Sequence, residues 1–239
     1  MNISVSTLVI EIGRMCNLNC KHCLRGHSQN IKVSLDTAKH LIDQINYIGS
    51  IVFTGGEPAL YGKEIAELVD YIISTDTSVE SFYVASNGTF YNAELMNALI
   101  TLYGYVDDKE MSAFELSTDI YHQESIDESG RIARFDPRFE AFSFFSKRGP
   151  ISETAILREG NAEANGFGGR YPKHDTPFTY EVYSDNADVD MLYLTAKGYL
   201  APHCDFSYNT YDELPLPQMD DINSAEDLID SLQDYNDEI

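Results

Sequence analysis

The chain has 239 residues, of which 43% are hydrophobic, and this is enough for the core of one large globular domain. Its 16 basic and 39 acidic side chains give a net charge of -23. Such a surface repels phosphate backbones, so we expect no nucleic-acid partner. No apolar stretch reaches the roughly 18 to 20 residues needed to cross a bilayer, and no charged and apolar leader opens the chain. We therefore expect no membrane partner and a cytoplasmic location.

Apolar runs alternate with helical patterns along the chain, a rhythm typical of a parallel sheet. The first expected strand, residues 7–12, leads into a loop in which Cys16, Cys20 and Cys23 lie within eight residues. Three thiolates at this C-x3-C-x2-C spacing can hold three irons of a 4Fe-4S cluster and leave the fourth iron without a protein ligand. A zinc site completed by His27 or Cys204 also fits this ligand chemistry. The spacing alone therefore does not decide between an iron-sulfur cluster and a zinc ion.

The cysteine block resembles the signature of the radical S-adenosylmethionine (SAM) enzymes, including the aromatic His22 just before the third cysteine. The resemblance implies that Cys16, Cys20 and Cys23 bind a 4Fe-4S cluster whose open iron chelates SAM. It also implies reductive cleavage of SAM to a 5'-deoxyadenosyl radical, which abstracts hydrogen from a substrate. The implied partner is a reductant protein such as flavodoxin or ferredoxin.

A helix with Ser34 as its N-cap leads to the second expected strand, residues 50–53, and then to Gly55, Gly56 and Glu57. Glycines let a backbone approach a ligand closely, although a plain strand-to-helix turn would also use this sequence. In the radical SAM family the matching segment receives the amino group of SAM through backbone carbonyls and the glutamate. The resemblance therefore implies that these three residues bind the cofactor.

Polar residues follow the third and fourth expected strands, residues 81–85 and 113–116: Asn87 follows the third, and Ser117 and Asp119 follow the fourth. In a parallel barrel the chemistry gathers at the carboxyl ends of the strands. These residues resemble the Ser/Thr-Asn-Gly and Ser-x-Asp steps of the family, which implies contact with SAM or the substrate. Asn-Gly is also a common turn, and Ser-x-Asp is frequently a helix cap.

Two further candidates lie in the following loops. His122 comes shortly after the fourth expected strand and is a candidate substrate contact. Arg158 follows the fifth expected strand, residues 153–157, where many relatives carry a Gly-Arg-Ala step and this chain has Asn161 in place of the arginine. Arg158 is therefore a candidate for binding the SAM carboxylate, for which the guanidinium fork is well shaped, or it is a surface arginine.

The sixth expected strand, residues 191–194, precedes Cys204 in a Gly-x-x-x-Pro-x-Cys stretch. This stretch is similar to the one that opens the auxiliary-cluster regions of some radical SAM peptide maturases. No cysteine follows it, so the chain cannot complete an auxiliary cluster. Cys204 is expected to be a buried thiol or a substrate-facing group. The similarity slightly favours a peptide or protein substrate over a small molecule of the kind used by deazaguanine-forming synthases.

Six expected strands in this length predict an open α/β barrel, since a full eight-stranded barrel takes around 250 residues. The family resemblance implies a partial (β/α)6 barrel, which we assign to residues 1–210. From Asp205 to the end there are 11 acidic residues and no lysine or arginine. We expect residues 211–239 to form an acidic C-terminal segment, a short docked helix with Ser224 as N-cap plus a tail. A non-catalytic zinc-binding interaction module is the alternative from another functional class.

Overall fold

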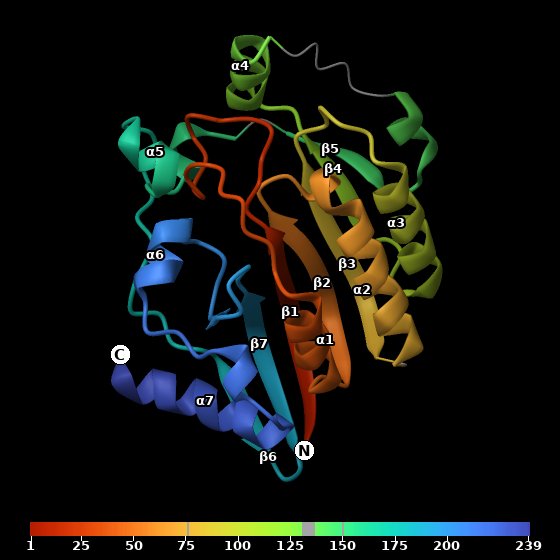
Figure 1. The fold of residues 1–239 in the computed structure, drawn as a ribbon, viewed down its shortest axis with the longest axis vertical. Helices are drawn as coiled ribbons and strands as arrows, with labels where there is room; N and C mark the ends of the chain where they lie inside the picture. Colours follow the sequence, from red (N-terminus) through yellow and green to blue (C-terminus); the bar gives the residue numbers. More distant parts are fainter. Residues whose placement is uncertain (76, 131–136, 150) are drawn as a thin grey trace.

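A curved sheet runs through the molecule, as seen in the computed structural model, which describes residues 1–75, 77–130, 137–149 and 151–239 (Figure 1). In this described part the strands follow the order β5-β4-β3-β2-β1-β7-β6, and β8 also pairs with β7. Neighbours from β5 to β7 are parallel, whereas β6 and β8 run antiparallel to β7. The strands are β1 (Asn2–Gly13), β2 (Tyr47–Gly55), β3 (Ser78–Ser86), β4 (Ala113–Ser117), β5 (Phe145–Arg148), β6 (Tyr180–Tyr183), β7 (Asn186–Leu194) and β8 (Leu200–Ala201).

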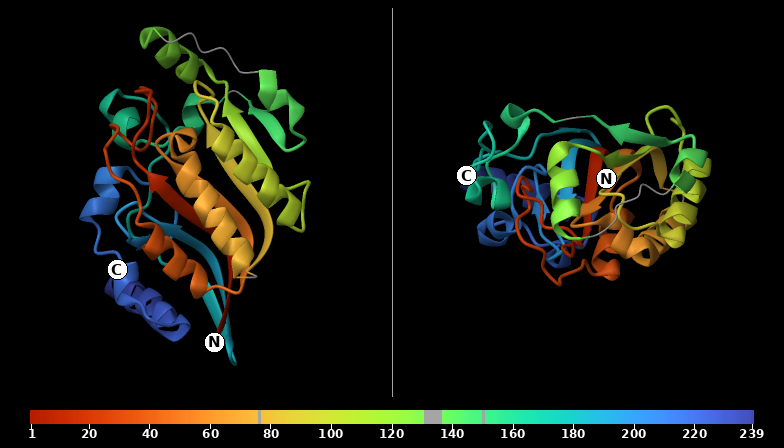
Figure 2. Two further views of the ribbon diagram at one scale, coloured as in Figure 1. Left: turned by 45° about the vertical axis from the view of Figure 1, so that its right-hand side comes forward. Right: turned by 90° about the horizontal axis from the view of Figure 1, so that it is seen from above.

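Helices α1 to α3 cover one face of the sheet (Figure 2). Ser34 caps α1 as predicted, because its side chain accepts a hydrogen bond from the Thr37 amide at 3.3 Å. The α-helices are α1 (Leu35–Asp43), α2 (Gly62–Ser74), α3 (Ala93–Tyr105), α4 (Ile120–Glu128), α5 (Gly160–Ala164), α6 (Tyr208–Glu213) and α7 (Ala225–Glu238). Short 3-10 helices are η1 (Pro58–Tyr61), η2 (Pro137–Ala141), η3 (Glu153–Ala155) and η4 (Met219–Asp221).

The two faces of the sheet have different roles, which follow from the alternation of side chains along each strand. Leu8, Ile51 and Phe82 lie at neighbouring register positions and are fully buried in the main hydrophobic core. On the opposite face, Val9 pairs in register with Val52, and both line a cavity. The helical face therefore supplies the core, and the other face is left open for a ligand.

The fifth strand was predicted in the wrong place. Residues 153–155 form the 3-10 helix η3, and Leu157 makes only an isolated bridge with Arg170. The strand next to β4 is β5, whose sequence Phe-Ser-Lys-Arg has no long apolar run. An edge strand buries little surface, so the hydrophobic pattern does not reveal it.

The sixth expected strand, residues 191–194, is the end of β7. This strand pairs in parallel with β1, where Val9 lies opposite Tyr193, and it does not lie next to β5. The last parallel strand thus returns to the first one, and β1 has parallel neighbours on both sides.

The C-terminal residues are packed against the rest of the chain. Ser224 caps α7 as predicted, accepting from the Asp227 amide at 3.1 Å, and Leu228, Leu232 and Tyr235 of this helix are buried. A domain boundary at residue 210 would fall inside α6. In Figure 1, α7 lies at the end of the molecule away from α4 and α5. None of the helices in the described ranges is both long and apolar enough to span a membrane.

Candidate active site

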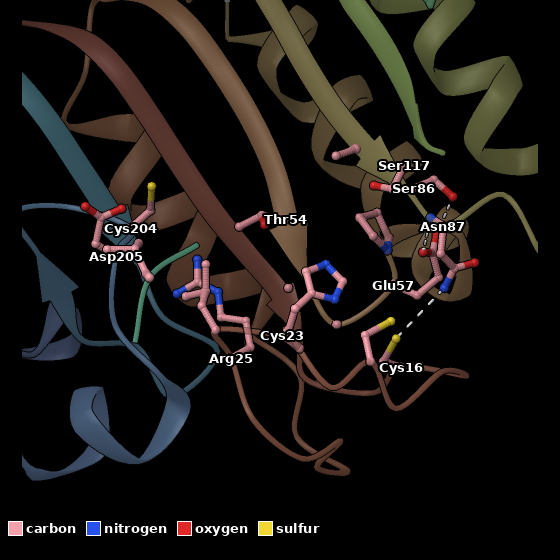
Figure 3. Close-up of a pocket in the computed structure, with 18 of the residues that line it drawn as sticks. Cys16, Cys23, Arg25, Thr54, Glu57, Ser86, Asn87, Ser117, Cys204 and Asp205 are labelled. Carbon is pink, nitrogen blue, oxygen red and sulfur yellow. Dashed lines mark hydrogen bonds between the residues drawn. The ribbon is translucent and has the colours of Figure 1, made fainter. Parts of the chain in front are cut away.

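A cavity of about 590 Å³ opens at the carboxyl ends of the parallel strands. Its floor is formed by inward-facing side chains of the central strands, among them Val9, Val52 and Met191. Polar and sulfur-bearing side chains from the following loops surround it (Figure 3). Cavities of this size are typical of small-molecule and cofactor sites.

The three predicted cysteine ligands line this cavity together. Cys16, Cys20 and Cys23 are free thiols, and their sulfur-bearing side chains form one small cluster beside Leu18 and Ile126. Burial raises the pKa of Cys16 to about 12 and that of Cys20 to about 11. The thiols are therefore protonated at neutral pH, and a metal would have to displace these protons on binding. Three converging thiols suit a cluster that keeps one iron open.

The Gly-Gly-Glu loop lies against the cysteine loop. The Gly56 amide donates to the Gly13 carbonyl at 2.8 Å, and the Glu57 amide donates to the Met15 carbonyl at 2.9 Å. A Cβ atom on Gly55 would lie 2.1 Å from the Gly13 oxygen, and Gly55 has a φ of +138. Both conditions favour glycine, so the sequence of this loop is explained by its close approach to β1.

Glu57 is 2% exposed and holds the ends of two strands together. Its carboxylate accepts hydrogen bonds from the Ser86 hydroxyl at 2.6 Å, the Asn87 amide at 2.8 Å and the Ala59 amide at 3.0 Å. Burial raises the pKa of Glu57, and the bonds from Asn87 and Ser86 oppose this rise. The side chain thus shapes the cavity wall, and one carboxylate oxygen, with a single protein donor, retains capacity for a ligand.

Asn87 and Ser117 line the cavity as expected from their positions after β3 and β4. The Asn87 side-chain amide donates to Asn17 at 2.8 Å and points at the Cys16 sulfur at 3.9 Å. Its carbonyl oxygen accepts from Thr89. The loop after β3 is therefore connected directly to the cysteine loop.

Asp119 is the N-cap of α4 and does not line the cavity. It accepts from the amides of Tyr121 and His122, and its second oxygen lies 2.6 Å from Nδ1 of His122. Burial raises the pKa of Asp119, but the hydrogen bond and charge of His122 outweigh it and bring the pKa to about 2. His122 does line the cavity, with its ring against that of His22 at 4.8 Å. Asp119 thus orients a cavity residue rather than facing a ligand itself.

The last two candidates are placed differently from each other. Cys204 lines the cavity, on the side opposite Glu57 and Asn87 (Figure 3). The guanidinium of Arg158 packs over the ring of Tyr171 at 5.3 Å and is not among the groups that line the cavity. The structure therefore gives no support to Arg158 as a ligand of the SAM carboxylate.

Further charged residues also line the cavity, among them Arg14, which was not identified from the sequence. Arg14, just before the cysteine loop, is fully buried and pairs with Glu11 and Asp212, each at 2.9 Å. Its position directly after a strongly apolar strand could have revealed it, because a charged residue buried at such a position needs a partner of opposite charge. Arg25, Arg148, Arg170 and Asp205 complete the charged part of the lining.

The sequence profile of the Radical SAM superfamily matches residues 10–164. The chain belongs to the radical SAM superfamily. An uncharacterized protein of Methanocaldococcus jannaschii is 32% identical over 92 residues, covering 37% of this chain and 32% of that protein. An AdoMet-dependent heme synthase of Methanosarcina barkeri is 33% identical over 94 residues, covering 37% of this chain and 26% of the relative. The matched part spans about a third or less of the length of these relatives.

Among solved structures, native anSMEcpe with bound AdoMet and Cp18Cys peptide is similar to this radical SAM chain with a TM-score of 0.47 at 13% identity. The similarity covers 100% of this chain and 82% of that one. Radical SAM proteins are enzymes that use a 4Fe-4S cluster and SAM, so the predictions of enzyme, cofactors and α/β partial-barrel fold are confirmed. Membership of this family favours an enzyme over the alternative of a non-catalytic zinc module. Of the two residues considered as a fourth zinc ligand, Cys204 lines the cavity with the cysteines and His27 does not.

Proposed function

We propose that this radical SAM enzyme binds its 4Fe-4S cluster through Cys16, Cys20 and Cys23 and holds SAM and a substrate in the adjoining cavity. The observation that supports this most is that three free thiols line the cavity together, on a loop that the Gly-Gly-Glu loop contacts through the hydrogen bond from the Glu57 amide to the Met15 carbonyl. A cluster held by these cysteines would supply the electron for reductive cleavage of SAM, the chemistry that starts hydrogen abstraction from a substrate.

The residues of the chain have distinct tasks in this proposal. The carbonyls of Gly55 and Gly56 and the carboxylate of Glu57 receive the ammonium of SAM. Asn87 and Ser117 line the same side of the cavity and contact the remainder of SAM. His122, oriented by Asp119, faces the substrate.

A peptide or protein remains the substrate class favoured by the sequence, with a small molecule as the alternative. The Gly-x-x-x-Pro-x-Cys stretch that supports a peptide forms the turn and loop around β8, so that Cys204 lines the cavity. A reductant protein such as flavodoxin or ferredoxin would deliver the electron to the cysteine loop.

The test is anaerobic reconstitution with iron and sulfide, followed by dithionite and SAM. We expect about four irons per chain and release of 5'-deoxyadenosine. Alanine in place of Cys16, Cys20 or Cys23 should abolish this release. Cys204→Ala is the matched control, since it removes a thiol from the opposite side of the cavity and should leave uncoupled cleavage intact (Figure 3). Zinc binding with no uptake of iron would refute the assignment.

A further inference from the structure

Arg25 is a buried cation on the wall of the cavity. The residue is only 9% exposed, and in Figure 3 its guanidinium points away from Cys23, toward Cys204 and Asp205. It donates to the Phe206 carbonyl at 2.7 Å and lies over the rings of Tyr193 and Tyr211 at 4.9 and 5.5 Å. Within the described residues it forms no ion pair with a carboxylate.

A buried guanidinium without a carboxylate partner is costly, because the charge loses its hydration without a compensating anion. Glu11 is close enough to influence Arg25, but its carboxylate accepts from Arg14 at 2.9 Å and from the Ala196 amide at 3.0 Å, and it forms no ion pair with Arg25 in the described part of the chain. The aromatic rings offset part of the cost through cation-π contact. An anion bound in the cavity would offset the rest of the free-energy cost of burying the Arg25 charge.

The lining as a whole has an excess of positive charge. Arg14, Arg25, Arg148 and Arg170 line the cavity, against the two carboxylates of Glu57 and Asp205. This is four of the eight arginines in a chain whose net charge is -23, so composition does not explain it. Arg14 is already neutralised by Glu11 and Asp212, so the excess comes from the other three arginines. Glu57 already accepts three protein hydrogen bonds, and Asp205 contacts Arg170 at 3.5 Å.

We propose that Arg25, with Arg170 at the rim, binds an oxyanion of the substrate, a carboxylate or a phosphate. The planar guanidinium fork matches both groups. This inference rests on the proposed function, because the anchored molecule is the one that donates hydrogen. Figure 3 separates Arg25 and Cys204 from Glu57 and Asn87, so substrate and SAM would occupy different sides. The apolar floor of Val9, Val52 and Met191 would contact the carbon skeleton.

The test is calorimetric binding to anaerobically reconstituted protein in the presence of SAM. Citrate, inorganic pyrophosphate and a tri-aspartate peptide serve as probes, and the tightest of them shows which source of oxyanion the site accepts. Arg25→Gln should weaken the tightest probe tenfold to a hundredfold, and Arg25→Lys should weaken it less. Lys32→Gln is the matched control, since it removes a charge from an exposed side chain outside the cavity and should bind as wild type does.

Should Arg25→Gln fail to fold, Arg170→Gln carries the test, because its side chain is 63% exposed and its loss should weaken the probe severalfold. No binding of any probe to the wild type, or equal binding to the arginine variants, would overturn the proposal. A changed cluster midpoint potential in Arg25→Gln with unchanged probe affinity would also overturn it, since Arg25 would then be a counter-charge for the cluster. Iron content and 5'-deoxyadenosine release without probe test the proposed function separately.

Discussion

The amide of Glu57 donates a hydrogen bond to the carbonyl of Met15 at 2.9 Å, which fastens the loop after β2 to the loop that carries the cysteines. The contact is possible only because the preceding residue has no side chain. A Cβ atom on Gly56 would lie 2.1 Å from the same Met15 oxygen. The position of the cysteine loop therefore depends on the position of the Gly-Gly-Glu loop, and on the absence of a side chain at Gly56.

Gly56→Ala should displace the cysteine loop, because the atom that its Cβ would meet belongs to the backbone and cannot rotate away. We expect the iron bound after reconstitution to fall severalfold, measured by iron and sulfide analysis. Gly104→Ala in α3 is the control, since nothing lies within 4 Å of its Cβ. It should keep full iron content and gain about 0.5–1 kcal/mol in unfolding free energy. Equal iron content in the two variants would contradict the joint placement.

Glu57→Gln should lower SAM affinity tenfold to a hundredfold, because it removes a charge-assisted hydrogen bond worth about 1.5–3 kcal/mol. The amide group that replaces one oxygen would also face a protein N–H donor, from Ala59 or Asn87. We therefore expect a loss of thermal stability as well, with cluster assembly retained. Ser86→Ala is the matched control, since it removes one donor to the carboxylate and keeps the charge. Unchanged SAM affinity in Glu57→Gln would place the ammonium elsewhere.

Asp119 should make the stability of the fold depend on pH in the acid range. Its pKa is lowered from 3.8 to about 2: burial raises it, but His122 lowers it more. Because the folded pKa lies below the unfolded value, the carboxylate stabilises the fold above about pH 4, and this stabilisation is lost as the pH falls toward 2. It amounts to about 2 kcal/mol at 1.36 kcal/mol per pKa unit.

Urea unfolding of wild type and Asp119→Asn at several pH values measures this effect. Asparagine can still cap α4, so the variant isolates the charge. We expect the difference in unfolding free energy to be present in the range above about pH 4 in which His122 is protonated, and to shrink below about pH 3. A constant difference across this range would show that His122 does not stabilise the Asp119 carboxylate.

Leu232→Ala should lower the free energy of unfolding by about 2–5 kcal/mol, because this α7 side chain is fully buried. Uncoupled SAM cleavage at low temperature should be unchanged, since the C-terminal segment carries no cysteine or histidine to bind a cofactor. Asp234→Ala, an exposed neighbour, should change stability by less than about 0.5 kcal/mol. Loss of the cluster in folded Leu232→Ala protein would contradict this division of roles.

The sequence was sufficient to predict the features that depend on local chemistry. Cys16, Gly55 and Asn87 follow apolar strands, and parallel strands bring such residues to the same end of a sheet. The location of β5 could not be predicted, because this edge strand is short and half exposed. The pairing of β7 with β1 could not be predicted either, because hydrophobic periodicity identifies a strand but does not show which strand it pairs with.

The chemistry of Arg25 illustrates a second limit. Two residues after Cys23, it could have been an exposed loop residue, and no spacing pattern distinguishes a solvated arginine from a buried one. Only the fold brings Tyr193 and Phe206, which are far away in the sequence, to its two sides. Whether a charged side chain is buried depends on the residues packed around it, and the tertiary structure determines which residues these are.

The place of β1 between β2 and β7 has a consequence for biosynthesis. β1 is translated well before its second partner, β7, which is complete only at Leu194. Until the ribosome reaches that point, one edge of the central strand has open hydrogen-bonding groups, and such edges promote aggregation. We therefore expect the chain to be most prone to aggregation in the interval between the synthesis of β1 and that of β7.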